Sequence, residues 1–163
     1  PGTVAVTANT ILLVEDNPDD RELMKLAFAQ GEIPHNLIVV ADGIEALNYL
    51  QRQVDNQGEI GESGDLSVTT MPALVMLDLN LPRINGIEVL KRIRANSHTQ
   101  IIPVVIISSS NEPQDLVDSY INGCNSYIRK PINFTQLQTF VREISTYWLT
   151  VNQLPPVFGV PNE

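Results

Sequence analysis

The sequence is poor in the residues that mark extracellular or nucleic-acid-binding proteins. A single cysteine, Cys124, excludes a disulfide within the chain and favours a reducing compartment. We expect it to be a small buried residue rather than a reactive thiol. Positive charge is scarce, since 10 Lys and Arg against 19 Asp and Glu give a net charge of −9, whereas direct binding to DNA or RNA needs a basic surface. No apolar run approaches the roughly 18 residues of a membrane span. We expect a cytoplasmic protein that binds neither nucleic acid nor membrane.

What the chain does have is a regular alternation of short aliphatic runs and amphipathic segments. The runs predict buried strands at residues 10–14, 37–40, 73–78, 103–108 and 126–129. Helices are predicted after each strand, the first with Asn17 as N-cap and the last with Asn133 as N-cap. The repeated β-α order predicts an α/β fold: a doubly wound, five-stranded parallel sheet with five helices.

The spacing of particular residues predicts which face of the first two helices points inward. In the first, Leu23, Leu26, Ala27 and Gln30 follow a helical period. In the second, Ile44, Leu47 and Leu50 are expected to face inward.

The length of 163 residues fits one domain. We predict an N-terminal arm at 1–9, a domain at 10–150 and a tail at 151–163. Residues 54–70 are rich in Gly, Ser and acids without a period, which predicts a long inserted surface loop. Such a loop is either functional or a tolerated insertion, and both readings stay open.

Polar residues recur where the predicted strands end. Right-handed crossovers bring these ends to one edge of a parallel sheet, so five side chains should converge: Glu15, Asp16, Asp78, Ser108 and Lys130. Taken alone, each of these residues also fits a purely structural role, as a helix-start acid, a turn residue or a solvated charge. Together, carboxylates that would hold Mg²⁺, a lysine and a hydroxyl are the parts of a phosphoryl-transfer site with a carboxylate nucleophile.

These residues lie in four motifs: V-E-D-N-P-D-D, M-L-D-L-N-L-P-R-I-N-G, P-V-V-I-I-S and Y-I-R-K-P. Over about residues 10–145 the chain resembles a CheY-like response-regulator receiver domain. The resemblance implies Asp78 as phosphoacceptor, Lys130 and Ser108 as catalytic partners, and a switch formed by Ser108 and Tyr127. It implies Mg²⁺ held by Glu15, Asp16, Asp78 and the carbonyl of Asn80. Ser110 and Asn80 are expected to tune hydrolysis of the phosphoryl group.

The long loop and the C-terminal sequence are similar to the small response regulators of cyanobacterial phytochromes. This similarity implies a phytochrome histidine kinase as phosphodonor and a homodimer formed through Tyr147, Trp148 and Leu149. The alternative is a tail that folds back on its own domain. The implied protein is a stand-alone signalling switch, not an enzyme beyond its own phosphotransfer and dephosphorylation, which signals through the face of helix four, strand five and helix five.

Two other functions were weighed against the receiver. A flavodoxin-like enzyme that binds a nucleotide or flavin lacks support, because E-D-N-P-D-D stands where glycines would cradle a phosphate. A receiver-shaped binding module that is never phosphorylated remains the alternative to the signalling switch.

Overall fold

The computed structural model describes residues 9–56, 71–131 and 133–155. Strands and helices alternate along the chain, ending in a short π-helix, η1: β1 (Asn9–Val14), α1 (Pro18–Ala29), β2 (His35–Val40), α2 (Gly43–Asp55), β3 (Leu74–Asp78), α3 (Gly86–Ala95), β4 (Val104–Ser108), α4 (Pro113–Ile121), β5 (Ser126–Arg129), α5 (Phe134–Thr146) and η1 (Tyr147–Val151). The strands form one parallel sheet in the order β2-β1-β3-β4-β5. The predicted α/β class and five-stranded sheet are confirmed.

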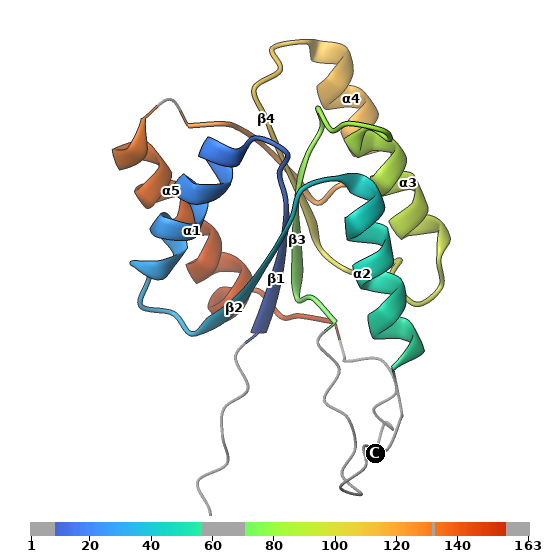
Figure 1. Ribbon diagram of the computed structural model, residues 1–163, viewed down its shortest axis with the longest axis horizontal. Helices are drawn as coiled ribbons and strands as arrows, with labels where there is room; N and C mark the ends of the chain where they lie inside the picture. The colour runs from blue at the N-terminus through green and yellow to red at the C-terminus, as the bar shows by residue number, and fades with distance from the viewer. Residues whose placement is uncertain (1–8, 57–70, 132, 156–163) are drawn as a thin grey trace, which may run out of the picture.

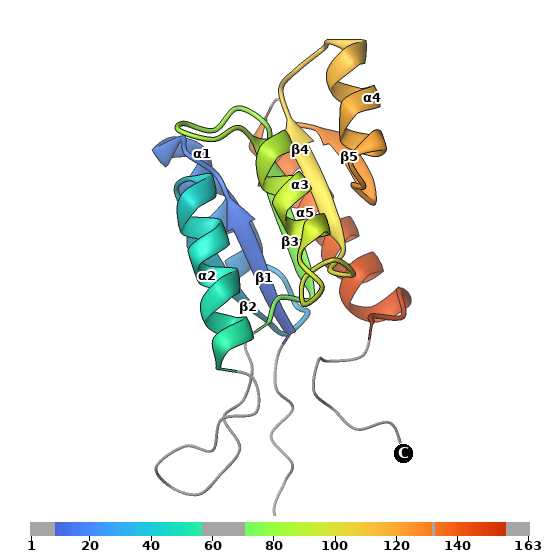
Figure 2. The same ribbon diagram turned by 90° about the vertical axis from the view of Figure 1, so that its right-hand side faces the viewer.

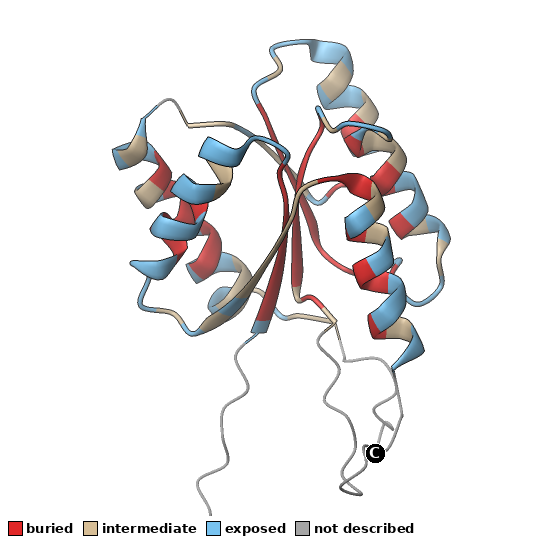
Figure 3. Ribbon diagram, in the orientation of Figure 1, coloured by how far each residue is buried: buried red, intermediate tan, exposed pale blue. Residues whose placement is uncertain are grey.

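The helices cover both faces of this sheet. Helices α1 and α5 lie on one face and α2, α3 and α4 on the other, as Figures 1 and 2 show. Because successive side chains of a strand point to opposite faces, β1 contributes to two apolar clusters. Leu12 and Val14 pack with α2 and α3, and Ile11 and Leu13 pack with α1 and α5. Strands β3 and β4 are buried along their whole length (Figure 3).

The helices begin where the sequence places short polar side chains. Asn17 accepts hydrogen bonds from the backbone N–H groups of Asp19 and Asp20, and Pro18 occupies the first helical position of α1. Asn133 accepts from the backbone N–H of Gln136 at the start of α5, as predicted. Each side chain satisfies backbone donors that have no partner inside the helix.

The predicted inner faces of α1 and α2 need correction. Helix α1 buries Met24, Ala27 and Phe28, whereas Leu23 and Leu26 are 42% and 49% exposed. Two neighbouring stripes of α1 are apolar, so the period alone did not select one. The ring of Phe28 fills the space under the sheet and meets the ring of His35 edge to face.

Helix α2 likewise presents a slightly different face than predicted. It buries Ala46, Tyr49 and Leu50, while Ile44 and Leu47 are half-buried. Of the three predicted residues, Leu50 is therefore the fully buried one. Gly43 and Gln53 are buried as well, so the inner stripe of α2 runs beside Ile44 and Leu47 and not through them.

Several predictions of domain organisation fall outside the described residues. Residues 1–8 of the predicted arm at 1–9, 57–70 of the predicted loop at 54–70 and 156–163 of the predicted tail at 151–163 are not described, whereas Asn9 belongs to β1 and Val151 to η1. Helix α2 continues through Asp55, so the first residues assigned to the loop are helical. Cys124 is buried, as expected. Among the described residues, no helix has the length and hydropathy needed to cross a membrane.

Candidate functional site

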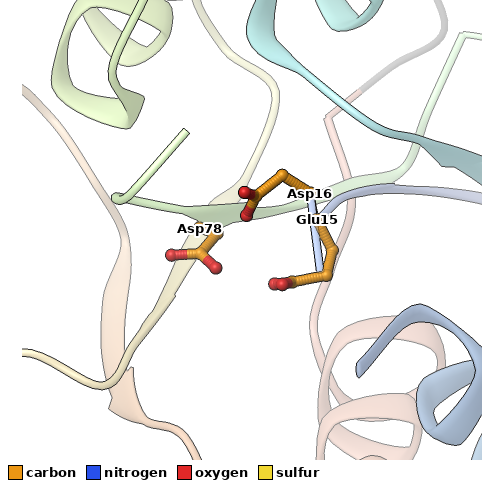
Figure 4. A group of neighbouring side chains, drawn as sticks. All are labelled: Glu15, Asp16 and Asp78. Atoms are coloured by element: carbon orange, nitrogen blue, oxygen red, sulfur yellow. The ribbon is translucent and has the colours of Figure 1, made fainter. Parts of the chain in front are cut away.

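The carboxyl edge of the sheet carries the polar residues that the sequence singled out. Glu15 and Asp16 directly follow β1, Asp78 is the last residue of β3, Ser108 ends β4, and Lys130 follows β5. The carboxylates of Glu15, Asp16 and Asp78 offer oxygen atoms that all lie within 4.8 Å of one another. Figure 4 shows these three side chains directed toward a common space. Glu15 and Asp78 are buried, and Asp16 is exposed.

Lys130 bridges the acidic side chains of this edge. Its Nζ lies 2.6 Å from Oδ2 of Asp78 and 3.1 Å from Oε2 of Glu15. It also lies 3.2 Å from Oδ2 of Asp20, an acid in the first turn of α1. Asp20 was not among the residues predicted to form the site. Its place in the first turn of α1 could have indicated this contact, because α1 begins at the same edge of the sheet as Glu15 and Asp16.

The backbone beside each carboxylate fixes its direction. The N–H of Asn17 donates to Oε1 of Glu15 at 3.1 Å, and the N–H of Asn80 donates to Oδ1 of Asp78 at 3.0 Å. The guanidinium of Arg21 donates to the main-chain carbonyls of Glu15 and Asp16. Asp78 is therefore held through one oxygen by its own loop and through the other by Lys130, before any ligand binds.

A glycine lies directly behind Asp78. A Cβ added at Gly86 would lie 2.3 Å from the carbonyl oxygen of Asp78 and 2.7 Å from Cα of Leu79. The N–H of Gly86 donates to the carbonyl of Leu79 at 2.9 Å, so α3 begins in contact with the end of β3. The N-G pair in the second motif is explained by this close approach.

Burial and crowding set the protonation of the cluster. Burial raises the pKa of Glu15 to about 8, and the hydrogen bond and charge repulsion from Asp78 add to this shift, while Lys130 partly offsets it. Burial alone would lower the pKa of Lys130, but its hydrogen bond and attraction to Asp78 and Glu15 raise that pKa above its usual value. The ammonium therefore stays charged. Three close carboxylates with hard oxygen atoms form an acidic metal-binding site, because a divalent cation removes their repulsion.

Ser108 ends the strand next to that of Asp78, and Tyr127 lies on β5 opposite Ile106. Ser108 is fully buried at the end of β4, and its Oγ accepts a hydrogen bond from the N–H of Ser110 at 3.0 Å. Its own carbonyl accepts from the N–H of Lys130 at 2.9 Å, which joins the ends of β4 and β5. Tyr127 packs against the apolar cluster under α2 and α3. Within the described part of the chain, its buried hydroxyl has no hydrogen-bond partner.

A pocket of about 140 Å³ adjoins Lys130 between α1 and α5. Its walls are mostly apolar, with the acidic groups at one end: Leu13, Val14, Glu15, Asp20, Leu23, Met24, Asp78, Ile107, Lys130, Pro131, Asn133, Phe134 and Leu137. Asp78, whose side chain is 3% exposed, is one of its lining residues.

The acidic cluster, Lys130 and the parallel sheet together indicate the class of protein. The family model described as the response regulator receiver domain matches residues 11–142, so the chain belongs to the response regulator receiver family. It is a signalling protein, and this membership sets the flavodoxin-like enzyme aside.

Two curated relatives span most of the chain. Response regulator Rcp1 of Synechocystis sp. is 36% identical over 145 residues, which cover 89% of this chain and 92% of Rcp1. The probable methanogenesis regulatory protein FilR2 of Methanothrix harundinacea is 38% identical over 145 residues, 89% of this chain and 86% of its own.

Solved structures point to the same relatives. The phosphorylated cyanobacterial phytochrome response regulator RcpA matches with a TM-score of 0.77 and 39% identity, covering 92% of this chain and 100% of that one. The Mn²⁺-bound form of Rcp1 matches with a TM-score of 0.75 and 34% identity, covering 91% and 99%. The similarity to cyanobacterial phytochrome response regulators is thereby confirmed.

Proposed function

We propose that this chain accepts a phosphoryl group on Asp78 from the phosphohistidine of a kinase. An oxygen of the Asp78 carboxylate forms a bond to phosphorus, the phosphorus–nitrogen bond breaks, and the departing imidazole takes up a proton. The observation that carries the proposal is the contact of 2.6 Å between Lys130 Nζ and Oδ2 of Asp78, beside two further carboxylates. The buried nucleophile thus has a fixed cation next to the oxygen atoms of the incoming group.

Mg²⁺ is the metal that we assign to this reaction. Glu15, Asp16, Asp78 and the carbonyl of Asn80 would hold it, in keeping with its preference for oxygen ligands and partial hydration. When bound, the cation neutralises charge on the carboxylates and on the transferring phosphoryl group. Lys130 and the hydroxyl of Ser108 would contact the other phosphoryl oxygens. The relative Rcp1 has a Mn²⁺-bound form, which supports a divalent metal at this site.

Ser108 and Tyr127 form the proposed switch. The Ser108 hydroxyl would turn toward the phosphoryl group, and the Tyr127 ring would change position with it, altering the face of α4, β5 and α5. The unpartnered hydroxyl of Tyr127 supports two ring positions. An unsatisfied buried hydroxyl costs about 1–3 kcal/mol. The inward position of the ring carries this cost, whereas an outward position, in which water bonds to the hydroxyl, does not.

The kinase that we propose as phosphodonor is a phytochrome. RcpA is a cyanobacterial phytochrome response regulator, and it is similar to this chain over its whole length. FilR2, at similar identity, is named for methanogenesis, so a kinase of another sensory class is the outcome that would replace this partner. Transfer from a purified autophosphorylated cyanobacterial phytochrome, compared with a kinase of another sensory class, tests the pairing by rate.

Homodimerisation through the end of α5 and η1 is also proposed. Tyr147 and Val151 are 50% and 61% exposed, and the ring of Tyr147 stacks edge to face on Trp148 with centroids 5.1 Å apart. Trp148 and Leu149 pack partly against the cluster under α1 and α5, as the fold-back alternative requires. The dimer and the fold-back are therefore compatible. The inner side of this segment packs on its own domain, and its outer side is available to a second copy.

The phosphorylation proposal is tested by intact mass after incubation with acetyl phosphate. We expect a single phosphoryl adduct that requires Mg²⁺ and is absent from Asp78→Asn. Asp118→Asn, which removes a half-buried acid on α4, serves as the matched control and should keep the adduct. No adduct on the wild-type chain, with Mg²⁺ binding verified separately, would favour the binding module that is never phosphorylated.

Light scattering tests the dimer. Trp148→Ala should shift the protein toward monomer, and so should Tyr147→Ala, whose exposed ring contributes less to its own domain. If both variants keep the wild-type mass, the segment is not the interface.

A further inference from the structure

A chain of hydrogen bonds runs from Ser108 to the first turn of α4. The Oγ of Ser108 accepts from the N–H of Ser110 at 3.0 Å. The Oγ of Ser110 donates to Oδ2 of Asp115 at 2.5 Å and accepts from the N–H of Glu112 at 3.1 Å. The hydroxyl of Ser110 donates its proton in one contact and accepts through a lone pair in the other, so the three contacts exist at the same time.

These hydrogen bonds take the place of an ordinary helix cap. Glu112 is the N-cap residue of α4, and in the described structure its side chain makes no capping hydrogen bond. In the usual capping box, a carboxylate three positions on reaches back to the N–H of the N-cap residue. Here the hydroxyl of Ser110 stands between the two: it receives the N–H of Glu112 and bonds to Asp115. The start of α4 therefore depends on a residue in the preceding loop.

Asp115 is also tied into the helix that it begins. Its N–H donates to the carbonyl of Glu112, and its own carbonyl accepts from the hydroxyl of Ser119 at 2.7 Å. Ser119 is fully buried. A displacement of Asp115 would thus be transmitted to the buried side of α4. The opposite side of α4 presents an apolar surface: Leu116, Val117, Tyr120 and Ile121.

We propose that Ser110 and Asp115 are positioning residues that latch the first turn of α4 to the hydroxyl of Ser108. The inference rests on the proposed function, in which that hydroxyl turns toward the phosphoryl group. When it turns, Oγ leaves the N–H of Ser110, the loop loses its anchor, and the bonds from Ser110 to Glu112 and Asp115 weaken. The first turn of α4 then moves or frays, and the apolar surface of α4 changes with it.

The first test needs no phosphorylation. Residue-resolved hydrogen exchange measures the amides of Glu112 and Asp115 in four proteins: wild type, Ser108→Ala, Ser110→Ala and the double variant. Either single substitution should speed exchange by about fivefold, the factor for one lost hydrogen bond, and the double variant should add nothing further. Independent effects, or no effect of Ser108→Ala, would overturn the latch.

Two further variants separate the latch from a general weakening of α4. Asp115→Asn should speed exchange in the first turn, and Ser110→Thr, which keeps the hydroxyl, should restore the wild-type rate. Asp118→Asn is the matched control, since the Asp118 carboxylate accepts a hydrogen bond from the side chain of Gln114 within the same helix. Equal effects of Asp115→Asn and Asp118→Asn would show a charge effect on the helix instead of a latch.

The second test uses the phosphorylated protein. Intact mass reports the phosphoryl content of each sample, so failure of phosphorylation is recognised independently of the exchange data, and the first test still decides the latch. In the wild type, phosphorylation should speed exchange in the first turn of α4. In Ser110→Ala the fast rate should be present beforehand and should not rise further. An equal rise in both proteins would overturn the inference while leaving the phosphorylation of Asp78 intact.

Discussion

Gly86→Ala provides a sharp test of how Asp78, the proposed phosphoacceptor, is positioned. The added Cβ would lie 2.3 Å from the carbonyl oxygen of Asp78, whereas ordinary contacts of a Cβ begin at 3.4 Å. The neighbouring atom is backbone, so no side-chain rotation relieves the contact. Either α3 or the end of β3 has to move by about 1 Å.

The magnitude follows from two opposing terms. Alanine is a better helix former than glycine by up to about 1 kcal/mol, which favours the variant. Forcing an extra methyl group into a packed site costs about 1–3 kcal/mol. We expect the free energy of unfolding to fall by about 1–2 kcal/mol, the remainder after this offset. A misplacement of about 1 Å in a reacting group can slow a reaction by about 100-fold, so phosphoryl uptake should slow by at least about tenfold.

Urea unfolding and the rate of Mg²⁺-dependent adduct formation with acetyl phosphate give the two readouts. Gly31→Ala is the matched control, because its added Cβ would lie 3.2 Å from the carbonyl of Phe28, at the end of α1 remote from Asp78. That variant should keep the rate of uptake. If Gly86→Ala is as stable as the wild type and takes up phosphate at the same rate, the close approach of α3 does not position Asp78.

Three further expectations concern groups away from the metal ligands. Arg94 donates to three main-chain carbonyls and to Asn125, so Arg94→Ala should lower the urea-derived free energy of unfolding by about 2–4 kcal/mol, whereas Arg92→Ala, which breaks an exposed pair with Glu88, should cost under about 1 kcal/mol. Burial raises the pKa of Cys124 and lowers its thiolate fraction, so Ellman's reagent should react quickly with it only in urea; rapid reaction of the native protein would contradict this. Tyr127→Phe should keep or raise thermal stability, since the lost hydroxyl has no partner within the described structure.

Much of the fold could be predicted because the central strands carry a simple signal. Strands β3 and β4 are buried on both faces, so their sequences are continuous aliphatic runs whose ends are visible. Asp78 stood out because a carboxylate is costly inside such a run. Once the strands were placed, the parallel topology required their carboxyl ends to meet, and Glu15, Asp78 and Lys130 do meet.

The features that could not be predicted depend on contacts between distant segments. The inner stripe of α1 was decided by how Phe28 fits under the sheet, and two stripes of that helix had suitable sequences. Asp20 joined the site because α1 starts close enough to Lys130 for an ion pair. The link from Ser110 to Asp115 depends on the path of the loop after β4, which residue type alone does not define.

Lys130 has a structural role in this site in addition to the chemical role that we propose for it. Its ammonium joins Asp20 of α1, Glu15 after β1 and Asp78 of β3, so it ties three elements to the end of β5. Removing one partner of a buried charged group is costly because the remaining charge is left uncompensated. A neutral residue in place of Lys130 would therefore disturb the geometry of Asp78 as well as the charge facing a phosphoryl group. Loss of phosphoryl uptake in such a variant would consequently measure both roles at once, whereas Asp20→Asn removes one tie and leaves the ammonium against Asp78.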